Sequence, residues 1–179
     1  MPHDAHRVSA LMTLLRERWV FALATNALDQ APYVTPLFYA TTELSPWLGR
    51  VAPALVFASS PRSTHGRHLG AGPVAVGGAV YLESEAIGAL RGLQLRGRVV
   101  LGARLPAEIR RALERAYLDR HPVAARVLAP ADGPPAHALF VLAITWVKLT
   151  DNRVRFGHHE IAEFADAWDE LDLHEPGGT

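Results

Sequence analysis

The strongest constraint on the fold is a series of apolar segments, each of a length that suits a β-strand, and most of them separated only by short turns. Segments rich in β-branched and aromatic residues lie at 19–25, 33–42, 54–58, 74–83, 90–102 and 137–150. Short connections between sequential strands favour antiparallel pairing. We therefore expect five or six antiparallel strands, and a barrel or closed sheet is the usual way to hide the edges of such a set.

One helix is expected before this series, and a pair of helices is expected just before its last segment. Residues 5–18 read as an amphipathic helix with Leu11, Leu14 and Leu15 on one face. Pro106 suits the start of a second helix, and residues 121–129 suit a short third one. The strands do not alternate with helices, so a dinucleotide-binding βαβ arrangement is not expected. A chain of 179 residues suits a single domain over residues 1–179.

Charge and composition exclude several classes of protein. Lys plus Arg and Asp plus Glu both number 18, and zero net charge argues against a nucleic acid as the partner. The chain has no cysteine, which excludes disulfides, thiolate metal sites and a cysteine nucleophile. The charged N-terminal segment lacks the apolar stretch of a signal peptide, and no run is long enough to cross a bilayer. We expect a cytoplasmic protein that does not bind membranes.

The segment after the third apolar run is dense in hydrogen-bond donors. Ser59, Ser60 and Pro61 read as a helix start, and Gly70 reads as the end of that helix. Free backbone N–H groups there would combine with hydroxyl, arginine and histidine side chains, which suits a phosphate monoester. The alternative is a capped surface helix that binds only water. His65 and His68 have the spacing of a metal-binding pair, but no carboxylate lies nearby, so no metal site is predicted.

The apolar runs also bear on assembly and on the solvent face. Segments 19–25 and 138–147 are apolar on both faces, so a helix or a second chain must cover the faces outside the barrel, and we expect a homodimer. Within 90–102, Gln94, Arg96 and Arg98 alternate with apolar residues and are expected on the solvent side.

The order of these pieces resembles the FMN-binding split-barrel superfamily related to pyridoxamine 5'-phosphate oxidase. The segments that carry the resemblance are FALATNALDQAPYVTPLFYA, LVFASSPRSTHGRHLGAGPVAV and GLQLRGRVVL. The segments RGLQLRGRVVLG, AYLDRHPVAARVLA and VKLTDNRVRFG resemble its uncharacterised bacterial YhbP-like branch. The resemblance covers about residues 8–158, which leaves 159–179 as a C-terminal tail. It implies a mainly β (α+β) fold, an antiparallel six-stranded split β-barrel with flanking helices, and a homodimer with cofactor sites at the interface.

The resemblance also implies which residues bind FMN. The family's phosphate-binding Ser-x-Lys or Ser-x-Arg corresponds to Ser63-Thr64-His65, so histidine stands at the usual basic position and Arg62 or Arg67 would compensate. His65 would then be the pH-sensitive cation of the site. The backbone of Thr35, Pro36 and Leu37 would follow the flavin ring. The remaining implied contacts are Ser59 and Ser60 at the ribityl chain and phosphate, Gln94 at the flavin, and Trp146 and Asn152 of a second copy.

Several of these residues also have a plainer interpretation. Gln94 suits a sheet-surface amide, Asn152 suits a turn, and Trp146 and Phe156 suit core packing, which we favour for Phe156. Ser59 or Ser60 with His65 imitates a serine–histidine pair, but no acid is placed to orient the imidazole. No catalytic residue is therefore assigned, and the substrate-binding arginine and histidine motifs of the oxidase are not recognisable. The resemblance implies an FMN-dependent oxidoreductase of a small substrate; the alternative is a non-catalytic protein that binds heme or a flavin-type ligand.

Overall fold

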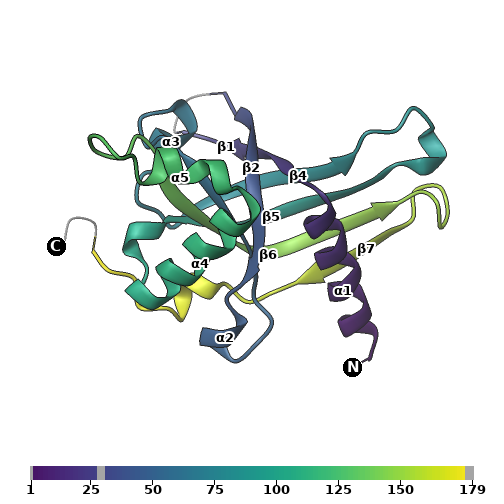
Figure 1. The fold of residues 1–179 in the computed structure, drawn as a ribbon. Helices are drawn as coiled ribbons and strands as arrows, with labels where there is room; N and C mark the ends of the chain where they lie inside the picture. Colours follow the sequence, from purple (N-terminus) through teal and green to yellow (C-terminus); the bar gives the residue numbers. More distant parts are fainter. Residues whose placement is uncertain (1, 28–30, 176–179) are drawn as a thin grey trace.

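The computed structural model describes residues 2–27 and 31–175, and the side chains within residues 9–27 and 31–175. Its strands form one antiparallel sheet in the order β3-β2-β1-β4-β5-β6-β7, and an additional pairing of β3 with β6 closes the first six into a barrel (Figure 1). The predicted six-stranded antiparallel barrel is thus confirmed, with one strand added. The strands are β1 (Val20–Thr25), β2 (Tyr33–Glu43), β3 (Pro53–Ser59), β4 (Val74–Leu82), β5 (Arg91–Leu101), β6 (Ala138–Asp151) and β7 (His159–Glu163).

Strand β6 belongs to two parts of the sheet. Its residues 138–143 pair with β3, whereas residues 146–150 pair with β7, and β5 runs along both halves. A bulge at Arg96/Gly97 of β5 marks the change. A Cβ on Gly97 would lie 2.0 Å from the carbonyl oxygen of Ala143, so glycine lets the two backbones approach at the bulge. Residues 159–163, which we expected in a tail, therefore extend the sheet.

Strand β2 is likewise divided, and this explains Pro36. Residues 33–38 pair with β1 and residues 39–43 pair with β3. Within the described residues, the first half of β2 has a strand on one side only. Proline lacks a backbone N–H and is tolerated at such an edge. The prediction that Pro36 lies at an edge or a bulge is confirmed.

The barrel interior is apolar and is closed at one end by α1 (Pro2–Glu17). The predicted amphipathic face is confirmed, because Leu11, Leu14 and Leu15 are at most 2% exposed. The hydroxyl of Tyr39 on β2 donates to the carbonyl of Leu15 at 2.7 Å, which ties the helix to the barrel. The buried barrel residues that pack with the helix include Phe21, Leu23, Leu55, Phe57, Val80, Leu93, Leu95, Val99, Phe140, Leu142 and Val147.

A second apolar layer covers the outer face of β3 and of the first half of β6. Helix α4 (Ala107–Arg120) supplies Ile109, Leu113 and Tyr117, and the 3₁₀ turn η4 (Ala167–Asp169) supplies Trp168, all nearly fully buried. Their partners in the sheet include Val56, Val100 and Val141. The second face of segment 138–147 is thus covered within the chain, whereas Val20 on the outer face of β1 stays 41% exposed.

Short elements complete the chain. They are α2 (Ser45–Leu48), α3 (Thr64–Leu69), α5 (Ala125–Leu128), and the 3₁₀ turns η1 (Ile87–Ala89), η2 (Gly102–Arg104) and η3 (Pro122–Ala124). Among the described residues, no helix has the length and apolar character needed to span a membrane.

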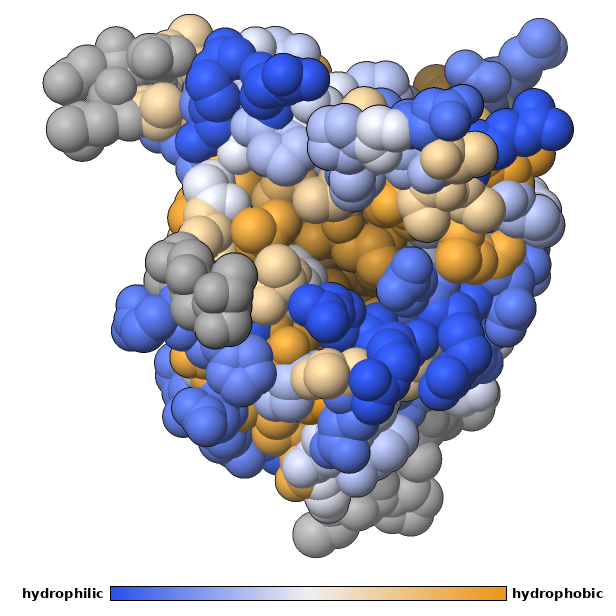
Figure 2. All heavy atoms as spheres, turned by 60° about the vertical axis from the view of Figure 1, so that its left-hand side comes forward, coloured by the Kyte–Doolittle hydropathy of each residue, from blue (hydrophilic) through white to orange (hydrophobic). Residues whose placement is uncertain are grey.

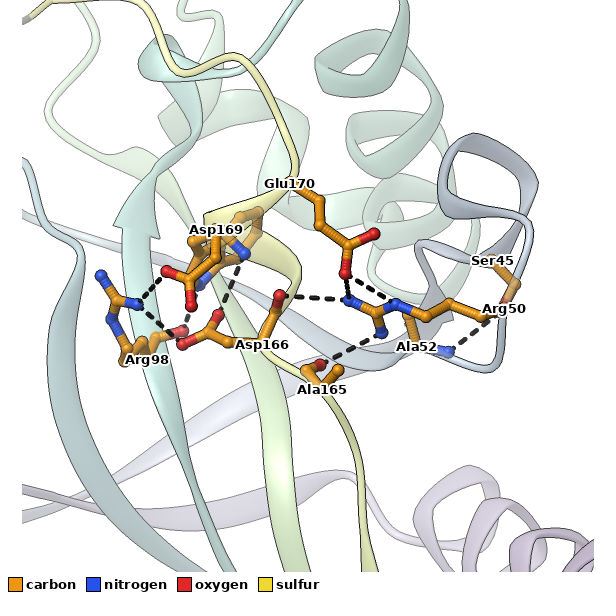
Figure 3. Close-up of polar contacts among 9 residues, drawn as sticks. Ser45, Arg50, Ala52, Arg98, Ala165, Asp166, Asp169 and Glu170 are labelled. Atoms are coloured by element: carbon orange, nitrogen blue, oxygen red, sulfur yellow. Dashed lines mark hydrogen bonds and ion pairs between the residues drawn. The ribbon is translucent and has the colours of Figure 1, made fainter.

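Arginines hold the segment after β7 against the barrel (Figure 3). Arg98 Nη1 donates to Asp166 Oδ2 and to Asp169 Oδ1, both at 2.8 Å. Arg50 pairs with Glu170 and also donates to the carbonyls of Ala165 and Asp166. Arg98 lies on the outer side of β5 as expected, with its side chain 34% exposed, but two carboxylates from the C-terminal segment pair with it. Neither carboxylate belongs to the strand pattern from which the expectation came.

Candidate functional site

The donor-rich segment leaves β3 at Ser59 and forms a turn before it becomes helical. The Ser63 N–H donates to the Ser60 carbonyl at 3.0 Å, and the Ser63 hydroxyl donates to the same oxygen at 2.7 Å. The helix N-cap is Ser63, whose hydroxyl oxygen accepts the N–H of Gly66 at 3.1 Å. The predicted helix start at Ser59, Ser60 and Pro61 is therefore wrong, because the Ser60 carbonyl closes a turn there. Gly70 ends α3 as predicted.

His65 lies inside this turn and is only 7% exposed. Its Nε2 is 2.5 Å from Ser59 Oγ and 3.1 Å from Ser63 Oγ. Because the Ser63 hydroxyl already donates its proton to Ser60, it can only accept from His65, which assigns the hydrogen to Nε2. His65 Nδ1 is buried and has no hydrogen-bond partner among the described residues. The imidazole thus acts as a neutral donor that fixes the turn.

This environment lowers the pKa of His65. Burial is the larger cause, because it disfavours the charged ring, and the nearby His68 adds to the effect. Protonation would place a buried N–H at Nδ1, where no described group accepts it. The expectation that His65 is the cation of a phosphate site is therefore wrong for the free protein. Any positive charge at the turn comes from Arg62 and Arg67.

The lowered pKa predicts a pH-dependent contribution to stability. A histidine with a depressed pKa stabilises the fold fully above its unfolded value of about 6.5, and this contribution is lost as pH falls through the folded-state pKa. We expect the urea midpoint of the wild type to fall more steeply between about pH 7 and pH 5 than that of His65→Gln, which keeps an N–H donor but does not titrate. The variant His159→Gln changes an exposed histidine and should follow the wild type. Parallel curves for wild type and His65→Gln would contradict this assignment.

Side chains that remain accessible at the turn are polar or cationic. Arg62 and Arg67 are exposed, and Ser60 and Thr64 are partly exposed. Arg67 Nη1 donates to the Arg62 carbonyl at 2.5 Å, and Nη2 lies 3.5 Å from Thr64 Oγ1, so the guanidinium stays over the start of α3. Ser59, in contrast, is 5% exposed and is used by His65. The outward donor set is therefore Ser60, Arg62, Thr64 and Arg67.

Tyr33 joins this turn to the start of β2. Its ring stacks on His65 with centroids 6.2 Å apart and meets His68 edge-on at 6.1 Å. His68 Nδ1 lies 3.0 Å from Thr25 Oγ1 at the end of β1. The predicted site residues Thr35, Pro36 and Leu37 follow Tyr33 on the same strand. Sequence reasoning missed Tyr33; a tyrosine after Pro32 at the start of a strand was the available signal.

The unpaired edge of β2 presents backbone groups on this side. In an antiparallel pair, successive residues direct their N–H and C=O alternately toward and away from the partner strand. Pro36 pairs in register with Ala22, and because it has no N–H it suits a position directed away from β1. The backbone groups of Val34 and Phe38 share this direction. Thr35 and Leu37 direct their side chains to the interior, opposite Leu23 and Phe21.

A groove of about 570 Å³ lies on the outer side of β1, β4 and β5. Thr25 and Pro32 at one end adjoin the His68 and Tyr33 contacts. Arg96 lines the groove, and its guanidinium stacks 4.7 Å from the ring centroid of Trp146. The small floor residues are Ala24, Ala75, Gly77 and Gly97. Apolar side chains also line a hollow on the side of the molecule where α3 and α5 lie, with hydrophilic residues around much of it (Figure 2).

The other predicted site residues lie away from the turn. Gln94 is an exposed residue of β5 in register with Lys148, as the plainer interpretation has it. Asn152 follows the end of β6, while Ser59 pairs with Ala138 at its beginning. A strand of 14 residues spans roughly 45 Å at about 3.3 Å per residue, so Asn152 is remote from the turn of its own chain. Phe156 is 76% exposed, so the interpretation as core packing is wrong.

Asn152 has a structural role that occupies its side chain. Its Nδ2 donates to the Ile87 carbonyl at 2.8 Å, its backbone N–H donates to the Leu90 carbonyl at 3.0 Å, and its Oδ1 accepts from the Gly157 N–H at 3.0 Å. The first two bonds join the β4–β5 loop to the β6–β7 loop, and the third lies within the β6–β7 loop. Asn152 therefore has the turn role that its plainer interpretation gives it, and it also connects two loops.

No protein-family model matches the chain, and no curated protein matches it. Solved structures share its fold. A heme-binding protein from Mycobacterium smegmatis aligns with TM-score 0.64 and 20% identity over 87% of this chain, which spans 57% of that protein. An FAD-binding protein from Mesorhizobium loti aligns with TM-score 0.55 and 22% identity, over 78% of this chain and 90% of the other. A putative pyridoxamine 5'-phosphate oxidase from Listeria innocua aligns with TM-score 0.52 and 11% identity, over 79% and 95%.

These likenesses confirm the split-barrel fold that the sequence resemblance implied. At identities of 11–22%, these likenesses establish the fold. Which ligand this chain binds is argued from its own residues. The assignment to the YhbP-like branch stays a prediction.

Proposed function

We propose that this chain is a flavoprotein that binds FMN at the turn formed by residues 59–67. The observation that carries the proposal is the unpaired edge of β2 next to a turn rich in hydroxyl and arginine side chains, the two joined by Tyr33. A phosphate needs several donors and positive charge, and a flavin ring needs donors and acceptors along one edge. The occurrence of FAD-binding and pyridoxamine 5'-phosphate oxidase-like proteins among the structural neighbours supports this pairing.

The donor set at the turn fits a phosphate monoester. Ser60 and Thr64 offer hydroxyls, and Arg62 and Arg67 offer positively charged guanidinium groups. Helix α3 has only six residues, so its dipole adds little, and the side chains must supply most of the attraction. His65 contributes indirectly, because it holds Ser59 and Ser63 in place and thereby shapes the turn.

The β2 edge fits the ring of a flavin. The pyrimidine side of the flavin ring carries carbonyl oxygens and an N–H. These groups can pair with the outward backbone groups of Val34, Pro36 and Phe38. This matches the expectation that the backbone around Thr35, Pro36 and Leu37 follows the ring. Bound flavin would supply hydride or electron transfer, and the chain would supply position and hydrogen bonds.

A serine-nucleophile reaction is not supported by the same residues. Ser59 Oγ and His65 Nε2 are 2.5 Å apart, but the assigned hydrogen lies on Nε2, so the imidazole donates where a general base would accept. No carboxylate bonds Nδ1 within the described chain. The pair is therefore assigned to the structure of the turn.

The alternative is a non-catalytic protein that binds heme, and one observation favours it. His68 Nδ1 lies beside Thr25 Oγ1, and no described residue contacts its Nε2 by a hydrogen bond. Metal-binding histidines commonly have one ring nitrogen held by a hydrogen bond, which leaves the other for the metal. The heme-binding protein among the structural neighbours is consistent with this reading. A Soret band in the protein as purified would favour it over FMN.

Substitution of the two exposed arginines tests the FMN proposal. We expect Arg62→Ala and Arg67→Ala each to weaken FMN binding roughly tenfold to hundredfold, because each removes a charged hydrogen bond to phosphate. Arg115→Ala, on the exposed side of α4, is the control and should bind as the wild type does. Arg98 is unsuitable as a control because it holds Asp166 and Asp169. Quenching of flavin fluorescence gives the affinities, and unchanged values for both variants would contradict the proposal.

A further inference from the structure

An aromatic cluster joins the C-terminal end of α4 to the outer side of β1 and β2. Helix α4 lies beside β2 (Figure 1), and His121 follows its last residue. The centroid of the His121 ring is 4.9 Å from that of Tyr117, 5.6 Å from that of Trp19 and 5.7 Å from that of Phe38. His121 is thus in contact with three aromatic rings.

A hollow of about 420 Å³ opens beside this cluster. Its apolar walls are formed by Phe38, Tyr117, Pro122 and Val123, and its polar groups belong to Arg120 and His121. Phe38 is 59% exposed and Val123 is 73% exposed, so this apolar surface is open to solvent. Among the described residues, none with a carboxylate lines the hollow. Small-molecule sites have volumes of about 300–1,000 Å³, and this hollow falls within that range.

One ring nitrogen of His121 is free to bind a ligand. Nε2 lies 2.8 Å from the carbonyl oxygen of Tyr39. A carbonyl can only accept, so Nε2 carries the hydrogen, and Nδ1 of the neutral ring has a lone pair. Nδ1 has no hydrogen-bond partner among the described residues and is not buried. A ligand that meets Nδ1 must therefore donate a hydrogen bond, as a hydroxyl group does.

Arg120 supplies a positive charge that no described carboxylate pairs with. Its Nη2 donates to the carbonyls of Arg16 and Arg18, at 2.9 and 2.5 Å, and the guanidinium lies 4.1 Å from the ring centroid of Trp19. Nε is buried and has no acceptor in the described chain. Nη1 also has no described partner, but it is accessible. An anionic group on a ligand would provide the missing acceptor and the opposite charge.

The contacts made by Arg120 and His121 also fasten α4 to the barrel, and this structural role uses only part of each side chain. It uses Nη2 of Arg120 and Nε2 of His121, and it leaves Nη1 and Nδ1 available. The His121 N–H also donates to the Tyr117 carbonyl at 2.8 Å. Both polar groups are therefore held in place before a ligand arrives, which lowers the entropy lost on binding.

We propose that this hollow binds a small aromatic acid that carries a hydroxyl group. The ring packs against Phe38, Pro122 and Val123, the hydroxyl donates to His121 Nδ1, and the carboxylate accepts from Arg120 Nη1. This ligand class matches one acceptor, one cation and an apolar wall. The inference goes beyond the FMN proposal and does not rest on it. The two sites share only Phe38, whose backbone is assigned to the flavin and whose side chain lines this hollow.

Titration with the three isomers of hydroxybenzoate tests the site, with backbone amide signals in NMR spectra of the protein without added flavin as the readout. We expect at least one isomer to bind with a dissociation constant of about 1 mM or below. The largest shifts should belong to residues 120, 121 and 123. The methoxy acid of the same substitution pattern lacks the donor and should bind about fivefold more weakly. The phenol without the carboxylate should bind about tenfold more weakly.

Three outcomes of this titration would overturn the proposal. They are the failure of every isomer to bind, equal affinity for the hydroxy and methoxy acids, and largest shifts at residues 59–67. The last result would place the acid at the turn assigned to FMN. Because no flavin is present, the affinity for FMN is measured separately, and either proposal can fail while the other holds.

Variants separate ligand binding from the structural role of the same residues. His121→Gln keeps an N–H for the Tyr39 carbonyl but has no acceptor at the position of Nδ1, so it should lose the preference for the hydroxy acid over the methoxy acid. Val123→Asp adds a negative charge at an exposed position of the hollow, and Val123→Asn is its uncharged match. At low salt we expect Val123→Asp to bind the hydroxy acid about threefold more weakly than Val123→Asn does.

The neutral phenol is the control ligand, and the two Val123 variants should bind it equally. Circular dichroism and urea unfolding establish that each variant is folded before its affinity is measured. An unchanged preference for the hydroxy acid in folded His121→Gln, or equal affinity of the two Val123 variants for that acid, would overturn the proposal.

Discussion

Replacement of Trp168 by alanine is expected to lower the free energy of unfolding by about 3–5 kcal/mol, the usual cost of truncating a buried large aromatic residue. Trp168 is 5% exposed and belongs to the apolar layer that α4 and η4 form over β3 and β6. Its Nε1 donates to the Arg98 carbonyl at 2.7 Å, so the truncation also leaves that oxygen without this donor. The tail that Arg50 and Arg98 hold would lose its apolar anchor.

Urea unfolding monitored by circular dichroism measures this loss, because the far-ultraviolet signal comes mainly from the backbone. Trp168→Phe keeps most of the packing and loses the hydrogen bond, so its cost should be smaller. Trp146→Ala is the matched control: Trp146 is half-buried and packs against the Arg96 side chain. A cost below about 1 kcal/mol for Trp168→Ala would show that the C-terminal segment is dispensable to the fold.

Gly66→Ala is expected to weaken FMN binding more than hundredfold, beyond the effect of removing either arginine, because it displaces the whole donor set. A Cβ at this position would lie 2.3 Å from the Ser60 carbonyl oxygen and 2.9 Å from the Pro61 backbone. Those atoms are backbone and cannot rotate aside. The turn must therefore move away from α3, and the hydrogen bonds from Ser63 to the Ser60 carbonyl must break. We also expect a loss of about 1–3 kcal/mol in stability from the forced overlap.

The control for this variant is Gly88→Ala, because a Cβ there meets nothing within 4 Å. Its stability and its FMN affinity should match those of the wild type. Unfolding curves establish that Gly66→Ala is folded before its affinity is measured. Wild-type affinity in folded Gly66→Ala would mean that the ligand does not use this turn.

Local sequence pattern predicted the parts of the fold that depend on near neighbours. The apolar runs of β1 and β2 and the turn between them predicted their pairing, and Pro36 predicted the free edge correctly, because a missing N–H is a local property. The face of α1 followed from helical spacing for the same reason. The split of β6 between β3 and β7 could not be predicted, because it depends on a bulge opposite a distant strand.

The candidate site was predicted less completely, for physical reasons that particular residues show. Ser59, Ser60 and Pro61 have the composition of a helix start, but the Ser60 carbonyl accepts hydrogen bonds from Ser63, three residues further on, and closes a turn before the helix begins. From the sequence alone, His65 was expected to be a cation. Its burial, which lowers its pKa, depends on neighbours that only the folded structure shows. Arg98 and Asn152 engage groups about 70 and 65 residues away in sequence, respectively. Such contacts cannot be predicted from the spacing of neighbouring residues in the sequence.

The most direct test of the central claim compares FMN with riboflavin, which has the same ring but no phosphate. Both are titrated into the protein near neutral pH, with flavin fluorescence and the visible absorption spectrum as readouts. Loss of the phosphate removes the charged hydrogen bonds of Arg62, Arg67 and the hydroxyls, so riboflavin should bind at least about a hundredfold more weakly than FMN. Equal affinity for the two ligands, or a protein that binds neither and shows a Soret band with heme, would contradict an FMN site at residues 59–67.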